Sequence, residues 1–140
     1  MEAIFKDEVF YITGSSGGIG FATAKLCIEK GATVVITGRD ADNLKNAEAE
    51  LLKFSPKVIA HNVDVSNEFA IIESLNEVYK SCGRIDGLVN NAPSIHTGKI
   101  TDLSLSAWKT NFKANLDAVF LATKTVLPWM IEAKQGSIVN

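Results

Sequence analysis

Short apolar runs alternate with amphipathic stretches along this chain, and the order of run and stretch repeats four times. The predicted strands are 9–12, 33–36, 57–61 and a short one within 85–90. Apolar runs of this length, rich in β-branched residues at 33–36, are typical of strands buried on both faces of a sheet. We therefore expect a repeated unit of one strand followed by one helix.

The stretches between the strands carry apolar residues at the spacing of a helix that is buried along one side. The first predicted helix covers 18–30, and Gly31 suits its carboxyl-terminal cap. The last predicted helix is long and covers 106–133, within which Pro128 kinks or ends it. The candidate amino-terminal caps of the second and third helices are Asp40 or Asp42, and Ser66 or Asn67.

Strand–helix alternation forces parallel strands joined by right-handed crossovers. We therefore predict an α/β fold with a doubly wound parallel sheet of the Rossmann type and helices on both faces. Residues 137–140 look like a fifth strand just beginning, so the sheet is expected to be truncated there. We interpret 1–140 as one dinucleotide-binding domain that is incomplete. In such sheets ligands bind beyond the carboxyl ends of the strands.

A glycine-rich turn, Thr13 to Gly20, follows the first strand and opens the first helix. Glycine permits a tight turn and lets the backbone approach a phosphate without an intervening Cβ. The helix start adds unpaired N–H groups and partial positive charge. The turn lacks the Gly-Lys-Ser/Thr ending of a mononucleotide P-loop. It therefore predicts a dinucleotide site formed by Gly14, Ser15, Ser16, Gly18, Ile19 and Gly20.

Composition narrows the classes of function. Fourteen basic and sixteen acidic residues give a net charge of −2, which provides no general attraction for nucleic acid. The two cysteines and two histidines lack metal-ligand spacing, and we predict no metal site. The start of the chain has no signal-peptide pattern, and no apolar stretch is long enough to span a membrane. We expect a soluble cytoplasmic protein that does not bind membranes.

Five motifs in order resemble the short-chain dehydrogenase/reductase family. The turn resembles its Thr-Gly-x-x-x-Gly-x-Gly signature, and Asp64-Val65 after the third strand resembles its adenine-contacting pair. Asn90-Asn91-Ala92 resembles its Asn-Asn-Ala-Gly motif, and Asn115 resembles its catalytic asparagine. Residues 136–140 resemble the start of the strand that leads to its catalytic serine. The resemblance covers the whole chain and implies the amino-terminal portion of a longer reductase.

The resemblance also implies roles for single residues. Asp64 and Val65 would contact adenine, Asn91 and Ala92 would lie near the cofactor, and Asn115 would hold a water molecule in the proton relay. The residues alone leave simpler interpretations open. Asp64 is also a possible helix cap, Asn91 a loop residue bonded to local backbone, and Asn115 a link to a neighbouring element.

The end of the second strand bears on the choice of nicotinamide cofactor. A carboxylate there would favour NAD(H), whereas this chain has Gly38-Arg39. The planar donors of an arginine suit a 2′-phosphate, and within the family such a pair resembles NADP(H)-preferring members. We therefore predict NADP over NAD. Asp40 leaves two interpretations, a contact to the ribose or a helix cap, and Arg39 could also be an ordinary surface charge.

The implied reaction is hydride transfer between nicotinamide and the carbon of a small-molecule carbonyl or alcohol. The family's proton donor is a tyrosine with a lysine four residues later, and neither Tyr11 nor Tyr79 has that lysine. We expect both tyrosines to lie in the core and the 140-residue chain to be inactive on its own. The alternatives are a non-catalytic dinucleotide-binding module and a non-functional fragment.

Two further expectations concern the neighbourhood of the site and the assembly. Pro93 stands where the family usually has glycine, so the loop beside the nicotinamide is expected to differ. The family resemblance also implies a homo-oligomer formed through the helix at 106–133. The identity of the substrate does not follow from these residues.

Overall fold

The computed structural model describes residues 3–140 and contains one five-stranded parallel sheet. Its strands are β1 (Val9–Ile12), β2 (Thr33–Gly38), β3 (Val58–Asn62), β4 (Gly87–Val89) and β5 (Ser137–Val139). The order across the sheet is β3-β2-β1-β4-β5, and every neighbouring pair is parallel. This arrangement confirms the predicted doubly wound Rossmann-like fold. The chain reverses its direction of travel across the sheet between β1 and β4, where such folds bind ligands.

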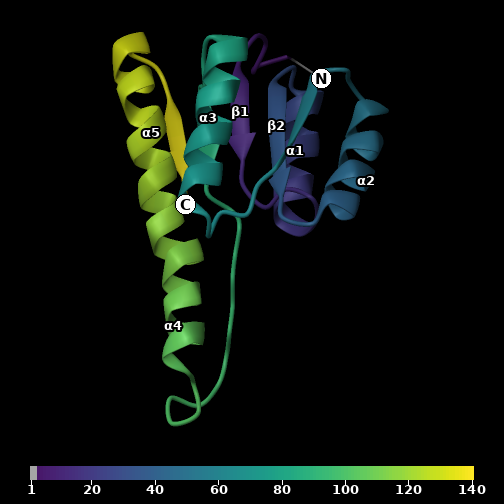
Figure 1. Ribbon diagram of the computed structural model, residues 1–140. Coiled ribbons are helices and arrows are strands. Elements are labelled where there is room, and N and C mark those ends of the chain that lie inside the picture. The colour runs from purple at the N-terminus through teal and green to yellow at the C-terminus, as the bar shows by residue number, and fades with distance from the viewer. Residues whose placement is uncertain (1–2) are drawn as a thin grey trace.

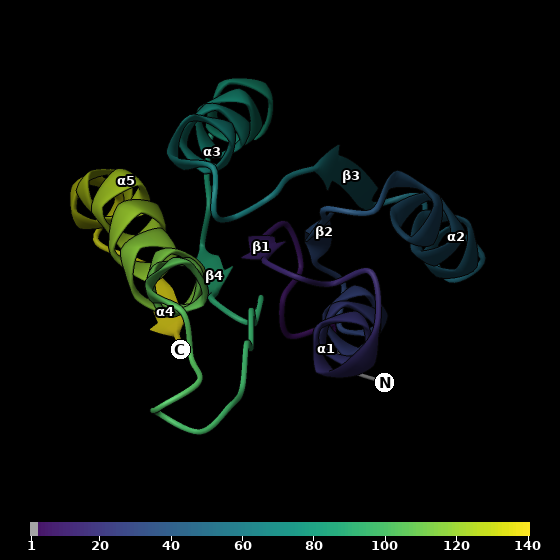
Figure 2. The ribbon, with the colours of Figure 1, turned by 60° about the horizontal axis from the view of Figure 1, so that its bottom comes forward.

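Helices cover both faces of the sheet (Figure 1). Figure 2 shows α1 and α2 on one face and α3, α4 and α5 on the other. A five-residue π-helical turn, η1, joins α4 to α5. The bounds are α1 (Gly18–Glu29), α2 (Ala41–Leu52), α3 (Glu68–Cys82), α4 (Leu105–Phe112), η1 (Lys113–Asp117) and α5 (Ala118–Ala133).

The strands β1 and β2 supply side chains to both layers because successive residues point to opposite faces. Tyr11 and Val35 pack with α3 and α5, whereas Ile12, Val34 and Ile36 pack with α1 and α2. All five side chains are fully buried. Burial on both faces explains why these strands read as continuous apolar runs rather than alternating ones.

The open alternatives for the helix starts are resolved by side-chain hydrogen bonds. The Asp40 carboxylate accepts the backbone N–H of Asn43 and caps α2. The Asn67 amide oxygen accepts the N–H groups of Phe69 and Ala70 and caps α3. Neither Asp42 nor Ser66 has the capping role. Of the two interpretations of Asp40, the structure therefore shows the helix cap.

The helix predicted over 106–133 consists in the structure of three consecutive elements, α4, η1 and α5. Pro128 lies inside α5, which continues to Ala133, so a helix end at that proline was wrong. Ala122, Val126 and Met130 of α5 are buried in the core on one side of the sheet, and this packing offsets the hydrogen bond that proline cannot make. The departure from α-helical geometry lies at η1 instead, a feature that often marks functional sites.

The segment between β4 and α4 contains no regular element in the described structure. It runs beyond the carboxyl ends of the strands, and α4 returns alongside it, so that the two project from the body of the molecule (Figure 1). The segment and α4 therefore form one wall of the region where a ligand of this fold would sit.

Candidate functional site

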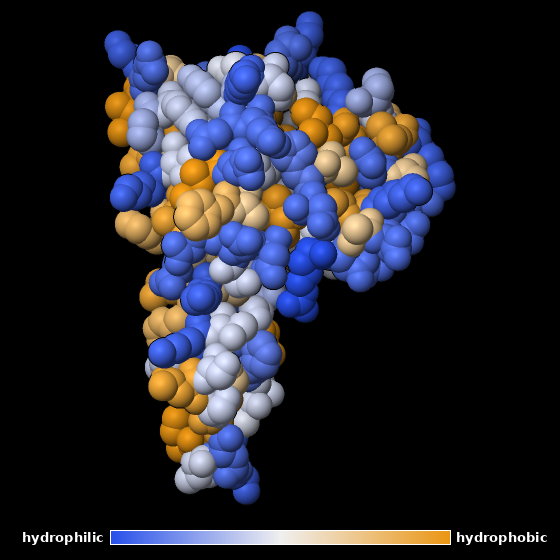
Figure 3. Space-filling view, in the orientation of Figure 1, coloured by the Kyte–Doolittle hydropathy of each residue, from blue (hydrophilic) through white to orange (hydrophobic). Residues whose placement is uncertain are grey.

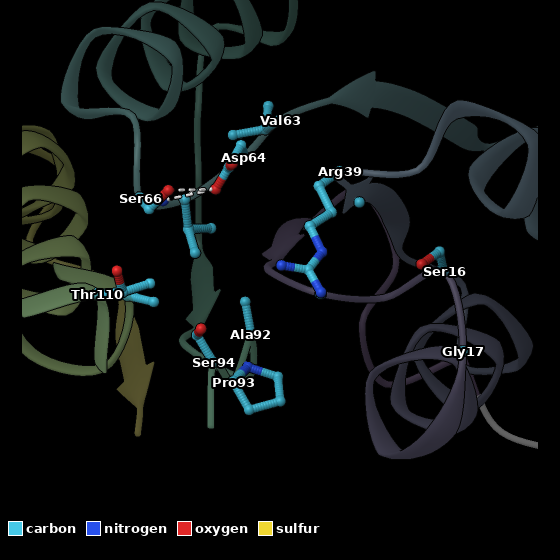
Figure 4. Close-up of a pocket in the computed structure, with 14 residues that line it drawn as sticks. Ser16, Gly17, Arg39, Val63, Asp64, Ser66, Ala92, Pro93, Ser94 and Thr110 are labelled. Carbon is cyan, nitrogen blue, oxygen red and sulfur yellow. Dashed lines mark hydrogen bonds between the residues drawn. The ribbon is translucent and has the colours of Figure 1, made fainter. Parts of the chain in front are cut away.

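A cavity of about 290 Å³ lies beyond the carboxyl ends of four strands. It is lined by segments that follow each strand and by the helix that returns along the β4 segment (Figure 4). The lining residues are Gly14, Ser16, Gly17, Gly38, Arg39, Val63, Asp64, Val65, Ser66, Ala92, Pro93, Ser94, Thr110 and Ala114. The fold therefore gathers the post-strand motifs of the sequence around one hollow.

The turn after β1 brings two backbone segments unusually close. Gly14 has φ +62°, and a Cβ built there would lie 2.6 Å from the Cα of Ala92. A side chain at this position would therefore be strained and would collide with the backbone after β4. This close approach joins the glycine-rich turn to the β4 segment at the switch point of the sheet.

The start of α1 is left open to an anion. Asp40, Asn67 and Ser104 cap the first turns of α2, α3 and α4 with their side chains. Among residues 3–140 no side chain caps α1, and its first turn has no acidic residue. The first N–H groups of this helix and its dipole can therefore accept a phosphate.

Thr13 and Asn91 hold the glycine-rich turn against the end of β4. The Thr13 hydroxyl oxygen accepts the N–H groups of Asn91 at 2.9 Å and Ala92 at 3.0 Å. The Asn91 side-chain amide donates to the carbonyl oxygens of Thr13 and Gly14. These bonds are not to local backbone, as the simpler interpretation of Asn91 had it, because Thr13 and Gly14 follow a different strand; its place near the cofactor stays a prediction. A Cβ at Gly20 would lie 2.5 Å from the Asn91 amide nitrogen, so this bracing requires glycine there as well.

Several residues of the predicted site lie outside the cavity lining. Ser15 is fully buried; its hydroxyl donates to the Ile12 carbonyl and accepts the Thr37 N–H, which links the ends of β1 and β2. Its hydroxyl therefore serves the sheet, and the cofactor contact expected of Ser15 stays a prediction. Ile19 is 80% exposed and points away from the core. Gly18, Gly20 and Asn91 are likewise absent from the residues that line this cavity.

Arg39 is the cationic side chain of the cavity lining. It extends from the end of β2 into the hollow, between Asp64 on one side and the turn at Ser16 and Gly17 on the other (Figure 4). A Cβ at Gly38 would lie 2.8 Å from the Ser16 hydroxyl oxygen, so the end of β2 has no room for a side chain before Arg39. The cavity thus offers a guanidinium and a hydroxyl on its β2 side.

Asp64 is held ionised in a tight turn. Its carboxylate accepts the Ser66 hydroxyl at 2.7 Å and the Ser66 N–H at 2.9 Å. These two hydrogen bonds, and to a smaller extent the nearby Arg39 charge, lower the pKa of Asp64 below its ordinary value, against a smaller opposing effect of burial. Asp64 does not cap α3, since that role belongs to Asn67.

Asn115 lies in η1, and its side chain is already bonded. The amide oxygen accepts the Ser94 N–H at 3.3 Å, and the amide nitrogen donates to the carbonyl oxygens of Ser94 and Asn111. The link to a neighbouring element, one of the two interpretations left open for this residue, is therefore present. A catalytic role for Asn115 stays a prediction.

The two tyrosines occupy packing positions. Tyr11 is fully buried, its hydroxyl lies 2.7 Å from that of Ser74, and burial raises its pKa above the ordinary value. The ring of Tyr79 stacks on Trp129 with centroids 4.1 Å apart. Neither side chain lines the cavity beyond the strands.

Sequence reasoning missed three polar side chains that line the cavity, Ser66, Ser94 and Thr110. Ser66 directly follows the Asp64-Val65 pair after β3, and that position was a usable signal. Ser94 was similarly placed after β4. Thr110 comes from α4, and no local pattern indicates that this helix returns to the cavity.

Among residues 3–140 no group of three or more histidine, cysteine, aspartate or glutamate side chains is arranged to hold a metal ion. The same residues include no helix that is both long and apolar enough to cross a membrane.

A doubly wound sheet with an uncapped glycine-rich helix start and a cavity at its switch point defines the class of dinucleotide-binding α/β proteins. The model of the short chain dehydrogenase family matches residues 8–140. The chain belongs to this family, whose members are oxidoreductases that bind nicotinamide dinucleotides. The resemblance seen in the sequence motifs is therefore confirmed.

Individual relatives are similar along nearly the whole chain. An uncharacterized oxidoreductase of Staphylococcus aureus is 31% identical over 137 residues, which cover 98% of this chain and 58% of the relative. The BbsD subunit of (2S)-[(R)-hydroxy(phenyl)methyl]succinyl-CoA dehydrogenase from Thauera aromatica is 36% identical over 135 residues, which cover 96% of this chain and 54% of that subunit.

Two solved structures are similar in fold and differ in their cofactor. A metagenomic short-chain oxidoreductase in complex with NADP superposes with a TM-score of 0.91 at 34% identity, covering 96% of this chain and 61% of that one. NAD+-bound xylitol dehydrogenase superposes with a TM-score of 0.92 at 29% identity, covering 98% of this chain and 53% of that one. The chain thus spans between 53% and 61% of the length of these relatives.

Proposed function

We propose that this chain is the cofactor-binding portion of an NADP(H)-dependent short-chain oxidoreductase. The pyrophosphate lies at the open start of α1, and the adenosine half occupies the cavity beyond β2, β3 and β4. The observation that carries the proposal is the convergence of Gly14, Arg39, Asp64 and Ala92 on one hollow at the switch point. The bound nicotinamide supplies the hydride chemistry, and the residues of this chain bind and orient the cofactor.

The preference for NADP rests on Arg39. Its guanidinium extends into the cavity, where it can pair with a 2′-phosphate, and Asp40, the nearest carboxylate along the chain, is occupied in capping α2. One similar structure holds NADP and another holds NAD+, so the family alone allows either cofactor. Backbone groups from Gly14 to Gly20, with Val65 and Ala92, complete the proposed contacts.

The proposed reaction is hydride transfer to or from a small-molecule carbonyl or alcohol, with Asn115 at the catalytic end of the site. The 140 residues contain no Tyr-x-x-x-Lys pair, and a positioned general acid is worth typically 10²–10⁴-fold. We therefore propose that this chain binds cofactor without turning over substrate at ordinary rates. A dinucleotide-binding module without catalysis is the competing proposal. NADPH oxidation with a panel of carbonyls, measured on the full protein that carries these residues, separates the two: turnover supports the oxidoreductase, and binding without turnover supports the module.

Thermal unfolding with and without NADPH tests the binding proposal. A ligand at about 100 times its Kd stabilises the folded state by about 2.7 kcal/mol. We expect one cooperative transition whose midpoint rises with NADPH concentration, and a smaller rise with NADH. A broad, non-cooperative transition that neither cofactor moves would instead support the non-functional fragment.

We also propose that the chain self-associates through the α4–α5 region. An apolar stripe of Trp108, Phe112, Leu116 and Phe120 is between 42% and 59% exposed along this region. Figure 3 shows orange, hydrophobic side chains on the projecting lower part of the molecule, where Figure 1 places α4 and the segment before it. Light scattering is expected to give a dimer or larger species for the unchanged chain and a smaller one for Phe120→Glu. Phe69→Glu, at an exposed phenylalanine of α3, is the matched control. A monomeric unchanged chain contradicts this assembly.

A further inference from the structure

The segment after β4 is held by two asparagine side chains from the helix that returns along it. The Asn115 amide pairs with both the N–H and the carbonyl of Ser94. One helical turn earlier, the Asn111 amide oxygen accepts the His96 N–H at 2.8 Å, and its nitrogen donates to the His96 carbonyl at 2.9 Å. Each asparagine therefore binds one backbone residue in the two-bond manner of a neighbouring strand.

The spacing of helix and segment explains why two such pairs can form. Residues four apart on a helix are separated by about 6 Å along its axis. Residues two apart on an extended chain are separated by about 6.7 Å and present their N–H and carbonyl groups to the same side. The spacing of the two asparagines thus matches that of their partners, with Asn115 opposite Ser94 and Asn111 opposite His96. Asparagine suits the task because its side chain carries both a donor and an acceptor.

This pairing connects two walls of the cavity. Ser94 lines it from the β4 segment, and Thr110 and Ala114 line it from the helix that carries the two asparagines. In Figure 4 the side chains of Ser94 and Thr110 lie on the same side of the hollow. Asn111 is the residue directly after Thr110, so its contact with His96 fixes the position of the segment relative to the helical wall.

We propose that Asn111 is a positioning residue of the cofactor site. It holds residues 94–96 against α4, so the cavity is already formed when the dinucleotide arrives. The inference rests on the proposed function and adds to it a residue that touches no ligand. Without the Asn111 contacts, binding must also order the segment, and that cost appears as weaker affinity.

The test compares Asn111→Ala and Asn111→Asp with Asn76→Ala, an exposed asparagine in the middle of α3. NADPH affinity is measured by calorimetry at a temperature where every variant is folded, and hydrogen exchange of the His96 amide is measured alongside. We expect Asn111→Ala to bind NADPH on the order of tenfold more weakly and to exchange the His96 amide faster. Asn111→Asp keeps the acceptor for that amide, so its NADPH affinity should lie between those of Asn111→Ala and the unchanged chain. Asn76→Ala should have the same affinity as the unchanged chain.

The outcomes separate this inference from the function on which it rests. If the unchanged chain binds NADPH and Asn111→Ala binds it equally well, the positioning role is overturned while the proposed function stands. A purely structural role would lower the unfolding temperature of Asn111→Ala without changing the affinity of the folded molecules. If the unchanged chain does not bind NADPH at all, the proposed function falls and the positioning role falls with it.

Discussion

Gly14→Ala is expected to lower the free energy of unfolding by about 2–5 kcal/mol and to remove measurable NADPH binding. Two costs add at this position. The residue has φ +62°, a conformation that disfavours side chains, and its Cβ would lie 2.6 Å from the Ala92 Cα. Relief of that contact must move the glycine-rich turn away from the β4 segment. Urea unfolding measures the first effect, and calorimetric titration of the folded protein measures the second.

Alanine substitutions at two other glycines distinguish the cost of backbone strain from the cost of the steric contact with Ala92. Gly83 has φ +74° with open space around its Cβ position, and Gly17 has extended backbone with no atom within 4 Å. Gly83→Ala should therefore cost about 1–2 kcal/mol, the strain alone, and Gly17→Ala should be nearly neutral in stability. Equal losses in all three variants would contradict the close approach of Gly14 to Ala92.

Arg39→Ala is expected to weaken NADPH binding by about 10- to 100-fold and to leave NADH binding nearly unchanged. Hydrogen bonds between a guanidinium and a phosphate are charge-assisted, and only NADPH carries the 2′-phosphate that this side chain would meet. The two dissociation constants, measured by fluorescence titration in the same buffer, give the ratio that tests the assignment. Because Arg39 is exposed, the loss should shrink as salt is raised.

Two further variants control for net charge and geometry. Lys45→Ala removes one exposed positive charge from α2 and should affect neither cofactor. Arg39→Lys keeps the charge without the planar donors and should lose part of the preference. Equal losses for NADPH and NADH in Arg39→Ala would remove the NADP assignment.

The strands and most helix bounds could be predicted because local features determine them. Apolar runs buried on both faces became β1 and β2, and Gly83 closed α3 in the left-handed conformation that it permits. The regular alternation of elements limited the topology to a doubly wound parallel sheet. Several site residues followed for the same reason, since parallel strands end at one edge and bring Gly14, Arg39 and Asp64 together.

Other features depend on which elements become neighbours in space. Ser15 sits within the glycine motif, yet its hydroxyl bonds to Thr37, a partner that exists only because β1 pairs with β2. Thr110 and Asn111 reach the site because α4 returns along the β4 segment. The continuation of α5 through Pro128 depends on the core that Val126 and Met130 join. No local propensity encodes these contacts.

The proposed function requires that a nicotinamide dinucleotide bind at the carboxyl ends of these strands. Backbone amide chemical shifts, followed during titration of the 140-residue chain with NADPH, test it most directly. We predict saturable changes confined to 14–20, 38–39, 63–66 and 92–94, with smaller changes at the same residues for NADH. Unchanged spectra, or changes centred instead on the cavity near Tyr79 and Trp129 at the opposite end of the sheet, would contradict it.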